Sequence, residues 1–423
     1  MFGVGLFIFL FAKPLIQHVV APGLGPEQLD TSVKIMQLIA FNPLLFTISG
    51  VLTSVQQTMG RFFFYAVAPL FYNICIIASI FIFRDNIGLV GLGIGALFGA
   101  VAQLVIVIFG LYKLNFHWRP YIKRRDQEFN TVLSNLPPRA LDQGIDQVQG
   151  VVETHIASGL GSGNITFFNN AFILATAPTL LIGSAISSAA FPRLNARLSA
   201  GRPDLFRRDF LKVLRALIWI SAPVVVVSYF ARGYLARLIY TNGNLKIANI
   251  FGFLCLAIFF RIIYTFISRW FYSQKDTRTP LFVSLFAISL NVFLAYTLAK
   301  PYAYGVEGLA LAQSIVAVVE VALLSLVMVV RDPKLITREF WSGVWRIISA
   351  TGFSVVACFI MISVYPLTLG DKGVISLGGK LLMIALVTFS VHILASWMFG
   401  LDEVKPIIKN VKRVILKPIK VQI

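Results

Sequence analysis

Residues 247–270 read IANIFGFLCLAIFFRIIYTFISRW, an apolar run that contains two arginines, Arg261 and Arg269, and no acidic residue. An α-helix rises about 1.5 Å per residue, so a run of this length crosses the roughly 30 Å hydrocarbon core of a bilayer. Arg261 lies near the middle of the run, where its side chain does not easily reach the membrane surface. The stretch predicts a transmembrane helix with a charged group that needs a partner or a ligand.

Similar apolar stretches recur along the whole chain of 423 residues, which is 57% hydrophobic and only 13% charged. Soluble domains carry about 25% charged residues, so this composition excludes an ordinary soluble protein. We expect an all-α, polytopic membrane protein with about twelve transmembrane helices in two pseudo-repeated bundles and a C-terminal helix pair. The predicted spans are 2–20, 33–58, 64–83, 88–112, 140–161, 165–191, 213–240, 247–270, 281–299, 306–330, 343–366 and 377–399.

The positions of the basic residues predict the orientation of these spans. Lysine and arginine total 37 against 18 acidic residues, and most of them lie in loops after even-numbered spans and in the tail from Lys405. Cytoplasmic loops carry the excess of lysine and arginine, so we expect both termini in the cytoplasm. The net charge of +19 is then a consequence of topology and of contact with lipid headgroups. We expect no nucleic acid partner, because the chain offers no soluble basic face with interleaved aromatic residues.

The two halves of the chain repeat the same landmarks at a nearly constant offset. The matched landmarks are Gln57-x3-Arg61 with Gln274-x3-Arg278, Gly88-x2-Gly91 with Gly305-x2-Gly308, and Asn73 with Asn291. An even number of crossings separates the copies, so this is a parallel repeat. The spans at 140–161 and 165–191 have no counterpart in the first half, and we therefore expect that two helices are absent before Met1.

The repeat also predicts how the chain is organised. We expect a remnant of the first repeat, a cytoplasmic linker, a second six-helix repeat, a C-terminal helix pair and a basic cytoplasmic tail. Their boundaries are 1–115, 116–139, 140–330, 343–399 and 400–423.

Polar side chains gather on the predicted helix 140–161. Asp142, Asp146 and Glu153 recur at helical spacing on one face, and Gln147 widens the polar side. Acidic groups inside a bilayer are costly and face a protein interior or a water-filled cavity. We interpret Glu153 and Gln147 as parts of a cavity wall, with Glu153 as a candidate for binding a coupling cation. Asp142 and Asp146 are interpreted as acids of the first helical turn near the headgroups.

Two further charged residues lie within predicted spans. Arg261 either meets a phosphate group of a substrate or forms a buried ion pair with an acid such as Glu153 or Glu320. Glu320 is either a cavity acid, and so a second candidate for ion coupling, or the partner of a basic group. The sequence leaves these alternatives open.

The loop from Gln274 to Pro280 is rich in charge and is predicted to lie on the cytoplasmic side. Lys275 and Arg278 could meet an anionic headgroup there, and Arg61 is the counterpart of Arg278 in the first half. The alternative is a capped turn whose positive charges serve only the orientation. No hydrolase triad, nucleotide-binding loop or metal-ligand cluster is present, so we expect neither an enzyme nor a cofactor, apart from a monovalent coupling cation.

The string Phe271-Tyr-Ser-Gln-Lys-Asp-Thr-Arg-Thr-Pro280 resembles the "FY-x-x-KDTRTP" signature of the MurJ/MviN lipid II flippases, within the multidrug/oligosaccharidyl-lipid/polysaccharide exporter superfamily. Glu153-Thr-His-Ile-Ala-Ser158 is similar to the family's "D/N-T-x-x-A-S". The resemblance implies two six-helix lobes around a central cavity, with 343–366 and 377–399 forming a lipid groove. It implies transport of an undecaprenyl-pyrophosphate-linked peptidoglycan precursor to the outer leaflet of the bacterial plasma (inner) membrane by alternating access.

The chain departs from the family pattern where anion-binding arginines are expected. Ile173 stands in the place of an arginine, and the family's first two helices, which carry others, are not in this sequence. Arg261 is the candidate substitute, with Lys275, Arg278, Arg61 and Gln147 completing the predicted substrate-binding set. The rival hypotheses are an ion-coupled exporter of small organic cations and a transport-inactive scaffold that recruits cell-wall synthesis proteins. Membrane lipids are expected partners under every hypothesis.

Overall fold

The structure is a computed structural model that describes residues 1–59, 61, 63–112, 144, 147–240, 245–368, 370–371 and 373–405. All regular secondary structure within these residues is helical. The helices of the first part are α1 (Phe2–Leu10), α2 (Ala12–Pro14), η1 (Leu15–Val20), α3 (Pro26–Ile39), α4 (Asn42–Thr58), α5 (Phe63–Phe83) and α6 (Val90–Gly110). The later helices are α8 (Asn164–Pro178), η2 (Thr179–Ser184), α9 (Ala185–Ser199), α10 (Pro203–Phe230), α11 (Arg232–Ile239), α12 (Leu245–Ser273), α13 (Arg278–Leu298), α14 (Glu307–Arg331), α15 (Arg338–Val364), α16 (Gly373–Met398) and η3 (Asp402–Val404).

Ten helices among the described residues are long and apolar enough to cross a membrane. The pair Phe2–Leu10 and Ala12–Val20, bent by 74°, adds an eleventh span if it is counted as one. These eleven match eleven of the predicted spans, which confirms the prediction of an all-helical polytopic membrane protein. The remaining prediction, 140–161, starts outside the described residues, and the chain is helical from 147 to 159. The predicted linker 116–139 and the tail beyond residue 405 also lie outside the described residues.

The contacts divide the chain into two compact units, Met1–Ser162 and Gly163–Ile423. The helix 147–159 groups with the N-terminal unit, whereas the predicted division starts the second repeat at residue 140. The repeat boundaries and the predicted domains themselves stay predictions.

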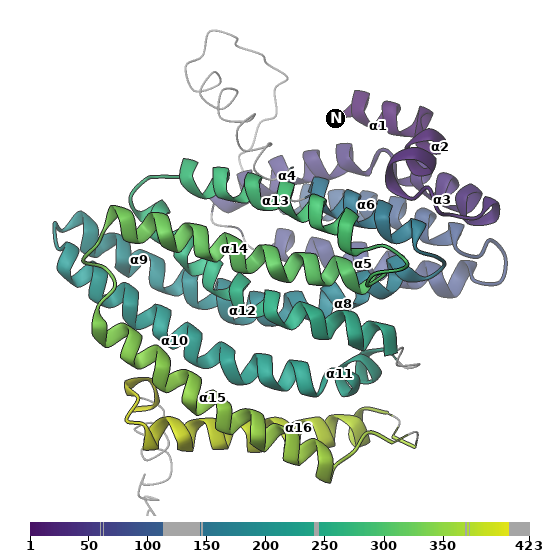
Figure 1. Cartoon of the computed structure of the whole chain (residues 1–423). Helices are drawn as coiled ribbons and strands as arrows, with labels where there is room; N and C mark the ends of the chain where they lie inside the picture. The colour runs from purple at the N-terminus through teal and green to yellow at the C-terminus, as the bar shows by residue number, and fades with distance from the viewer. Residues whose placement is uncertain are drawn as a thin grey trace, which may run out of the picture. The chain divides into compact units, whose positions relative to one another are not determined.

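The internal repeat is visible as a repeated packing order within each unit. In the N-terminal unit, α4 and α5 both pack against α6, and in the C-terminal unit α12 and α13 both pack against α14 (Figure 1). Gly88 and Gly305 both adopt a left-handed backbone, with φ of 63° and 56°, directly before α6 and α14. The glycine three residues later is crowded in both copies. A Cβ at Gly91 would lie 2.4 Å from Phe83 at the end of α5, and one at Gly308 would lie 2.4 Å from Leu298 at the end of α13.

Residues 247–270 belong to α12, which lies at the centre of the C-terminal unit. In its most apolar window, 61% of the residues are buried, against 17% for α13. Helix α12 packs against α8, α10, α11 and α14, so most of its apolar side chains are covered by protein.

Two described π-helices each begin directly after a proline. Pro14 precedes η1 and Pro178 precedes η2. Proline has no N–H and its ring clashes with the preceding turn, so the helical hydrogen bonds shift register at such sites. Pro178 therefore marks a change in the backbone of a single long span, Asn164–Ser199.

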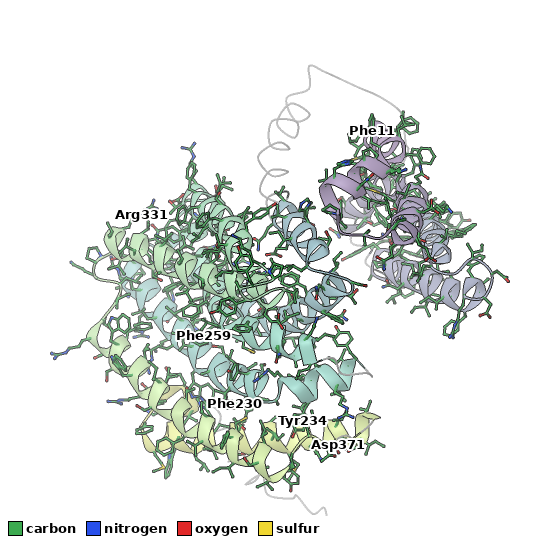
Figure 2. All side chains as sticks on the ribbon, turned by 45° about the vertical axis from the view of Figure 1, so that its right-hand side comes forward. Phe11, Phe230, Tyr234, Phe259, Arg331 and Asp371 are labelled. Atoms are coloured by element: carbon green, nitrogen blue, oxygen red, sulfur yellow. The ribbon has the colours of Figure 1, made fainter. Side chains whose placement is uncertain are left out.

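The last two long helices, α15 and α16, lie side by side and pack onto α10 (Figure 1). Two buried clusters join the three helices, one near Val226 and Ile384 and one near Trp219 and Ile347. At the end of the unit opposite Arg331, Tyr234 of α11 lies close to Asp371 of the loop between α15 and α16 (Figure 2).

Candidate functional site

A small cavity of about 150 Å³ lies between α8, η2, α12 and α14 inside the C-terminal unit. Most of its lining is apolar, and four side chains supply polar atoms. The polar lining residues are Thr176, Thr179, Arg261 and Gln313. The cavity follows the π-helix after Pro178, where the backbone of the span departs from regular α-helical geometry.

Among the described residues, Arg261 is the only charged one that lines this cavity. Its Nη2 donates a hydrogen bond to Oε1 of Gln313 over 3.3 Å, and its guanidinium lies 5.9 Å from the centre of the Phe172 ring. No acidic residue of the described C-terminal unit forms an ion pair with it. The buried ion pair with Glu320, left open by the sequence, is therefore not the arrangement found.

The hydroxyl groups of both threonines in the cavity already donate hydrogen bonds to carbonyl groups of their own helical segment. Thr176 donates its hydroxyl proton to the carbonyl of Phe172 over 2.9 Å, and Thr179 donates to the carbonyl of Ala175 over 3.3 Å. An arginine side chain has five N–H donors, of which the Gln313 contact uses one. The chemistry that the cavity offers is thus the donation of charge-assisted hydrogen bonds to an anionic or strongly polar oxygen.

Glu320 belongs to a separate polar network. Ser284 donates a hydrogen bond to Oε1 of Glu320 over 3.0 Å, and the Ser284 hydroxyl lies 2.7 Å from that of Tyr264. The network joins α12, α13 and α14. Glu320 therefore takes part in the hydrogen bonding that joins these three helices.

Glu153 lies in the N-terminal unit, on the helix 147–159, and is 5% exposed. Its carboxylate accepts a hydrogen bond from Nε2 of Gln149 over 2.9 Å. Gln147, predicted to line a cavity, has an exposed side chain. The predicted first-turn acids Asp142 and Asp146 lie outside the described residues.

The same helix holds the chain around η1. Nδ1 of His155 lies 2.8 Å from the carbonyl of Val19, and the backbone N–H of Gly23 donates to the hydroxyl of Ser158 over 3.3 Å. A Cβ at Gly23 would lie 1.9 Å from the Ser158 carbonyl oxygen, so only glycine fits there. The motif that contains Glu153 is therefore also a packing surface.

The signature turn between α12 and α13 is organised by Asp276. Its carboxylate accepts the backbone N–H groups of Arg278 and Thr279 over 3.0 and 3.1 Å. Arg331, at the end of α14, donates to the same carboxylate over 2.5 Å and to the Thr279 hydroxyl over 2.7 Å. The turn is thus capped and tied to the end of a neighbouring helix.

Lys275 and Arg278 are both exposed on this turn. Lys275 is the one non-glycine residue with a positive φ, 61°, among the described residues. That conformation is costly for a side chain with a Cβ, of the order of 1 kcal/mol. Arg61, the counterpart of Arg278, is exposed and donates to the Tyr112 carbonyl over 3.3 Å. None of these three residues lines the cavity at Arg261.

Sequence reasoning missed two residues that the structure makes important. Gln313 lies seven residues before Glu320 on α14, so a search for polar residues on the same helix face could have found it. Arg331 gave no signal, because its contact with Asp276 bridges 55 residues.

A family model described as "Lipid II flippase MurJ" matches residues 1–377. The chain belongs to the lipid II flippase MurJ family. The resemblance read from the signature turn is confirmed, and the family is one of transporters rather than enzymes. That two helices are absent before Met1 stays a prediction.

Two relatives show how far the similarity extends. A probable lipid II flippase MurJ of Borreliella burgdorferi is 24% identical over 316 residues, 73% of this chain and 62% of the relative. One of Rhizobium tropici is 22% identical over 423 residues, 94% of this chain and 77% of the relative. The chain thus spans less than two thirds of the first relative and about three quarters of the second.

Solved structures agree on the fold. A lipid II flippase MurJ in an inward closed conformation matches with a TM-score of 0.75 at 19% identity, over 94% of this chain and 80% of that one. A multidrug resistance MATE family transporter in an inward-facing conformation matches with a TM-score of 0.65 at 12% identity, over 79% of each chain. The helical architecture is therefore that of the MurJ and MATE transporters.

Proposed function

We propose that this chain carries lipid II, an undecaprenyl-pyrophosphate-linked peptidoglycan precursor, from the cytoplasmic to the outer leaflet of a bacterial plasma membrane by alternating access. The observation that carries the proposal is Arg261, a cationic group in a cavity within a membrane span, with no acidic partner in the described C-terminal unit. A diphosphate supplies the negative oxygens that such a group needs. The family membership supports the same substrate.

The exposed cations of the two corresponding turns would meet the headgroup first. Both termini, the signature turn with Lys275 and Arg278, and Arg61 lie on the cytoplasmic side under this proposal, as the distribution of basic residues predicts. Gln147 would contact the polar part of the substrate from the N-terminal unit. A cost in backbone strain at Lys275 is consistent with a functional demand on that side chain.

The lipid tail would lie along α15 and α16. Large apolar side chains are exposed on both helices, which suits contact with acyl chains. They include Phe353, Val356, Phe359, Leu382, Leu386 and Leu394. Glu153 and Glu320 are the proposed sites of a coupling monovalent cation, since each brings a carboxylate into a predicted membrane span, where Gln149 and Ser284 donate hydrogen bonds to them.

Complementation tests the proposal. In cells depleted of their own lipid II flippase, the unaltered chain should restore growth and outward movement of lipid II, and Arg261→Ala should abolish both. Arg261→Lys should retain part of the activity, because it keeps the charge but loses the planar guanidinium. Arg269→Ala is the matched control, since Arg269 lies on the same helix and stacks over Phe191, away from the cavity.

Membrane levels of every variant are measured alongside growth. Failure of the unaltered chain at normal membrane levels would reject the proposed function. Full rescue by Arg261→Ala would reject the role of Arg261 while leaving the function intact.

The second candidate function is the ion-coupled export of small organic cations, which the buried carboxylate of Glu153 favours. Overexpression would then confer resistance to cationic drugs, and Glu153→Gln would remove it, whereas the lipid flippase confers none. A transport-inactive scaffold for cell-wall synthesis proteins would instead show cross-linked partners without lipid movement in vesicles.

A further inference from the structure

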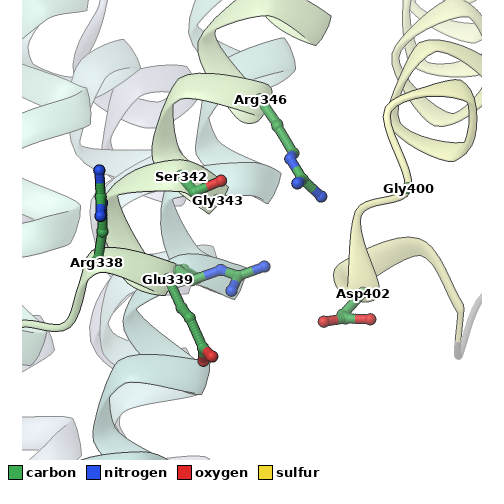
Figure 3. Close-up of a pocket in the computed structure, with 8 residues that line it drawn as sticks. Arg338, Glu339, Ser342, Gly343, Arg346, Gly400 and Asp402 are labelled. Carbon is green, nitrogen blue, oxygen red and sulfur yellow. The ribbon is translucent and has the colours of Figure 1, made fainter.

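A second, larger cavity of about 560 Å³ lies where α15 begins and α16 ends, separate from the cavity at Arg261. Arg338, Ser342 and Arg346 line it from α15, and Asp402 and Gly400 line it from the segment after α16 (Figure 3). Arg338, Ser342 and Arg346 are spaced four residues apart, so they share one helix face. Ser342 and Arg346 point toward the side of Gly400 and Asp402, whereas Arg338 points away from them at the margin of the cavity (Figure 3).

The inner wall of this cavity is Arg215 of α10. Arg215 forms a two-armed ion pair with Glu403, with contacts of 2.7 and 3.0 Å. Gly343 makes room for it, because a Cβ there would lie 2.6 Å from the Arg215 guanidinium carbon. The charge of Arg215 is thus neutralised by Glu403 and its side chain is held in place, so we assign it a structural role rather than a role in binding a ligand.

Arg338 and Arg346 differ from Arg215 because neither forms an ion pair within the part of the chain that the structure describes. The acid across the cavity, Asp402, is 2.6 Å from Lys405, and this hydrogen bond lowers the pKa of Asp402 below its ordinary value. Lys212 lies close enough to add to that effect. Around the cavity, five basic side chains face three acidic ones. These are Lys212, Arg215, Arg338, Arg346 and Lys405 against Glu339, Asp402 and Glu403.

Exposed tryptophans place the cavity at the depth of the lipid headgroups. Trp341 and Trp345 are 53% and 65% exposed on the first turns of α15, and Trp397 is 62% exposed on the last turn of α16. Tryptophan is enriched at the membrane–water interface, where its ring sits at the level of the headgroups. The two helices therefore cross the interface next to the cavity, whichever side of the membrane this end faces.

We propose that this cavity binds the phosphate group of an anionic phospholipid, with Ser342 and Arg346 as its direct contacts and Arg338 adding positive charge at the margin. Arg346 supplies charge-assisted hydrogen bonds to phosphate oxygens, the Ser342 hydroxyl supplies a neutral one, and the charge of Arg338 adds electrostatic attraction. The acyl chains of the bound lipid would extend along the exposed apolar surface of α15. The site holds the first turn of α15 to the end of α16, and it does not depend on the proposed transport function.

Native mass spectrometry of the purified full chain in detergent tests the site. The chain is titrated with short-chain phosphatidylglycerol and, separately, with short-chain phosphatidylcholine. We expect preferential retention of phosphatidylglycerol by the unaltered chain. Arg338→Gln combined with Arg346→Gln should weaken that retention by at least about tenfold, the loss expected when the charge-assisted hydrogen bonds of Arg346 and the charge of Arg338 are removed.

Two further variants make the result decisive. Lys334→Gln combined with Arg208→Gln removes the same charge from exposed residues outside the cavity and should leave retention unchanged. Arg338→Lys combined with Arg346→Lys should bind more phosphatidylglycerol than the glutamine variant, and thermal unfolding checks that each variant is folded. An equal loss in the control variant would overturn the proposal, because binding would then follow overall charge. Displacement of the lipid by millimolar inorganic phosphate would also overturn the lipid assignment, in favour of a soluble phosphate compound.

Discussion

The carboxylate of Asp276 lies 2.5 Å from the guanidinium of Arg331, so the turn that begins α13 is fastened to the residue that ends α14. The side chains are 22% and 43% exposed, respectively. Asp276 also accepts two backbone N–H groups of its own turn. The family signature on this turn is therefore in part a structural motif, because its aspartate holds the backbone that presents Lys275 and Arg278.

Asp276→Asn should destabilise the protein. The substitution removes a charge-assisted bond to Arg331 and weakens the cap, at a cost of roughly 1–3 kcal/mol. Thermal unfolding in detergent measures the effect. Asp204→Asn is the control, since the Arg202–Asp204 pair is exposed at 57% and 63%, and such solvent-screened pairs contribute little to stability. Equal losses in the two variants would contradict a structural role for Asp276.

The same residue predicts a dependence on acid. Burial alone would raise the pKa of Asp276, but hydrogen bonds from Thr279 and Arg331 outweigh it and hold the pKa well below its usual range. Ionised Asp276 therefore stabilises the fold at every pH above the ordinary aspartate value of about 3.9, and this stabilisation is lost as the pH falls below it. The difference in melting temperature between the unaltered chain and Asp276→Asn should shrink below about pH 4. A constant difference between pH 7 and acid would refute the assignment.

Lys275→Gly separates stability from function at the signature turn. Glycine adopts the observed φ of 61° without strain, so the variant should unfold at the same temperature or a higher one, with a gain of up to about 1 kcal/mol. If the Lys275 charge attracts the substrate headgroup, the same variant should complement flippase-depleted cells less well. Full complementation would mean that the turn serves only the fold.

Eleven of the twelve predicted spans correspond to helices or bent helix pairs. Hydropathy predicts them well because the backbone N–H and C=O groups of a membrane segment have no water to bond, and a helix pairs them within the segment itself. The matching spacing of Gly88 and Gly91 with Gly305 and Gly308 also predicted the corresponding glycine turns of the repeat. The sequence marks Gln313 at most as a polar residue on the Glu320 face of its helix, and it does not identify Gln313 as the partner of Arg261. An acid is the electrostatically obvious choice, yet the structure supplies the neutral amide of Gln313. Contacts of this kind depend on how α12 and α14 are placed, and hydropathy carries no information about that.

Gly308→Ala should be among the most damaging small substitutions in the C-terminal unit. The new Cβ would lie 2.4 Å from the backbone carbonyl oxygen of Leu298, which cannot move without disturbing the end of α13. Gly352→Ala is the matched control, because no atom lies within 4 Å of its Cβ position and α15 should gain about 0.5–1 kcal/mol in helix propensity. Melting temperatures of the two variants should shift in opposite directions, and a shift of the same sign would contradict the close packing of Gly308 against α13.

Tyr234→Phe tests the loop between α15 and α16. The Tyr234 hydroxyl donates a hydrogen bond to the carbonyl of Tyr365. Removal of this hydrogen bond should lower the free energy of unfolding by about 1 kcal/mol. Burial, aided by the charge of Asp371, raises the pKa of Tyr234. The unaltered chain should therefore lose stability as the pH rises past about 10, and the variant should lose less. Tyr302→Phe, at an 82% exposed residue, is expected to change neither melting temperature nor its dependence on alkali.

The paired glycine corners before α6 and α14 give the molecule an internal reference. Each corner makes the same left-handed turn and then brings one helix against the end of its predecessor, at places far apart in the chain. A substitution in one corner can thus be calibrated against its twin in the same polypeptide, under identical solvent, lipid and temperature. Any inequality between the twins then reports what their different surroundings contribute, a comparison that ordinarily requires two separate proteins.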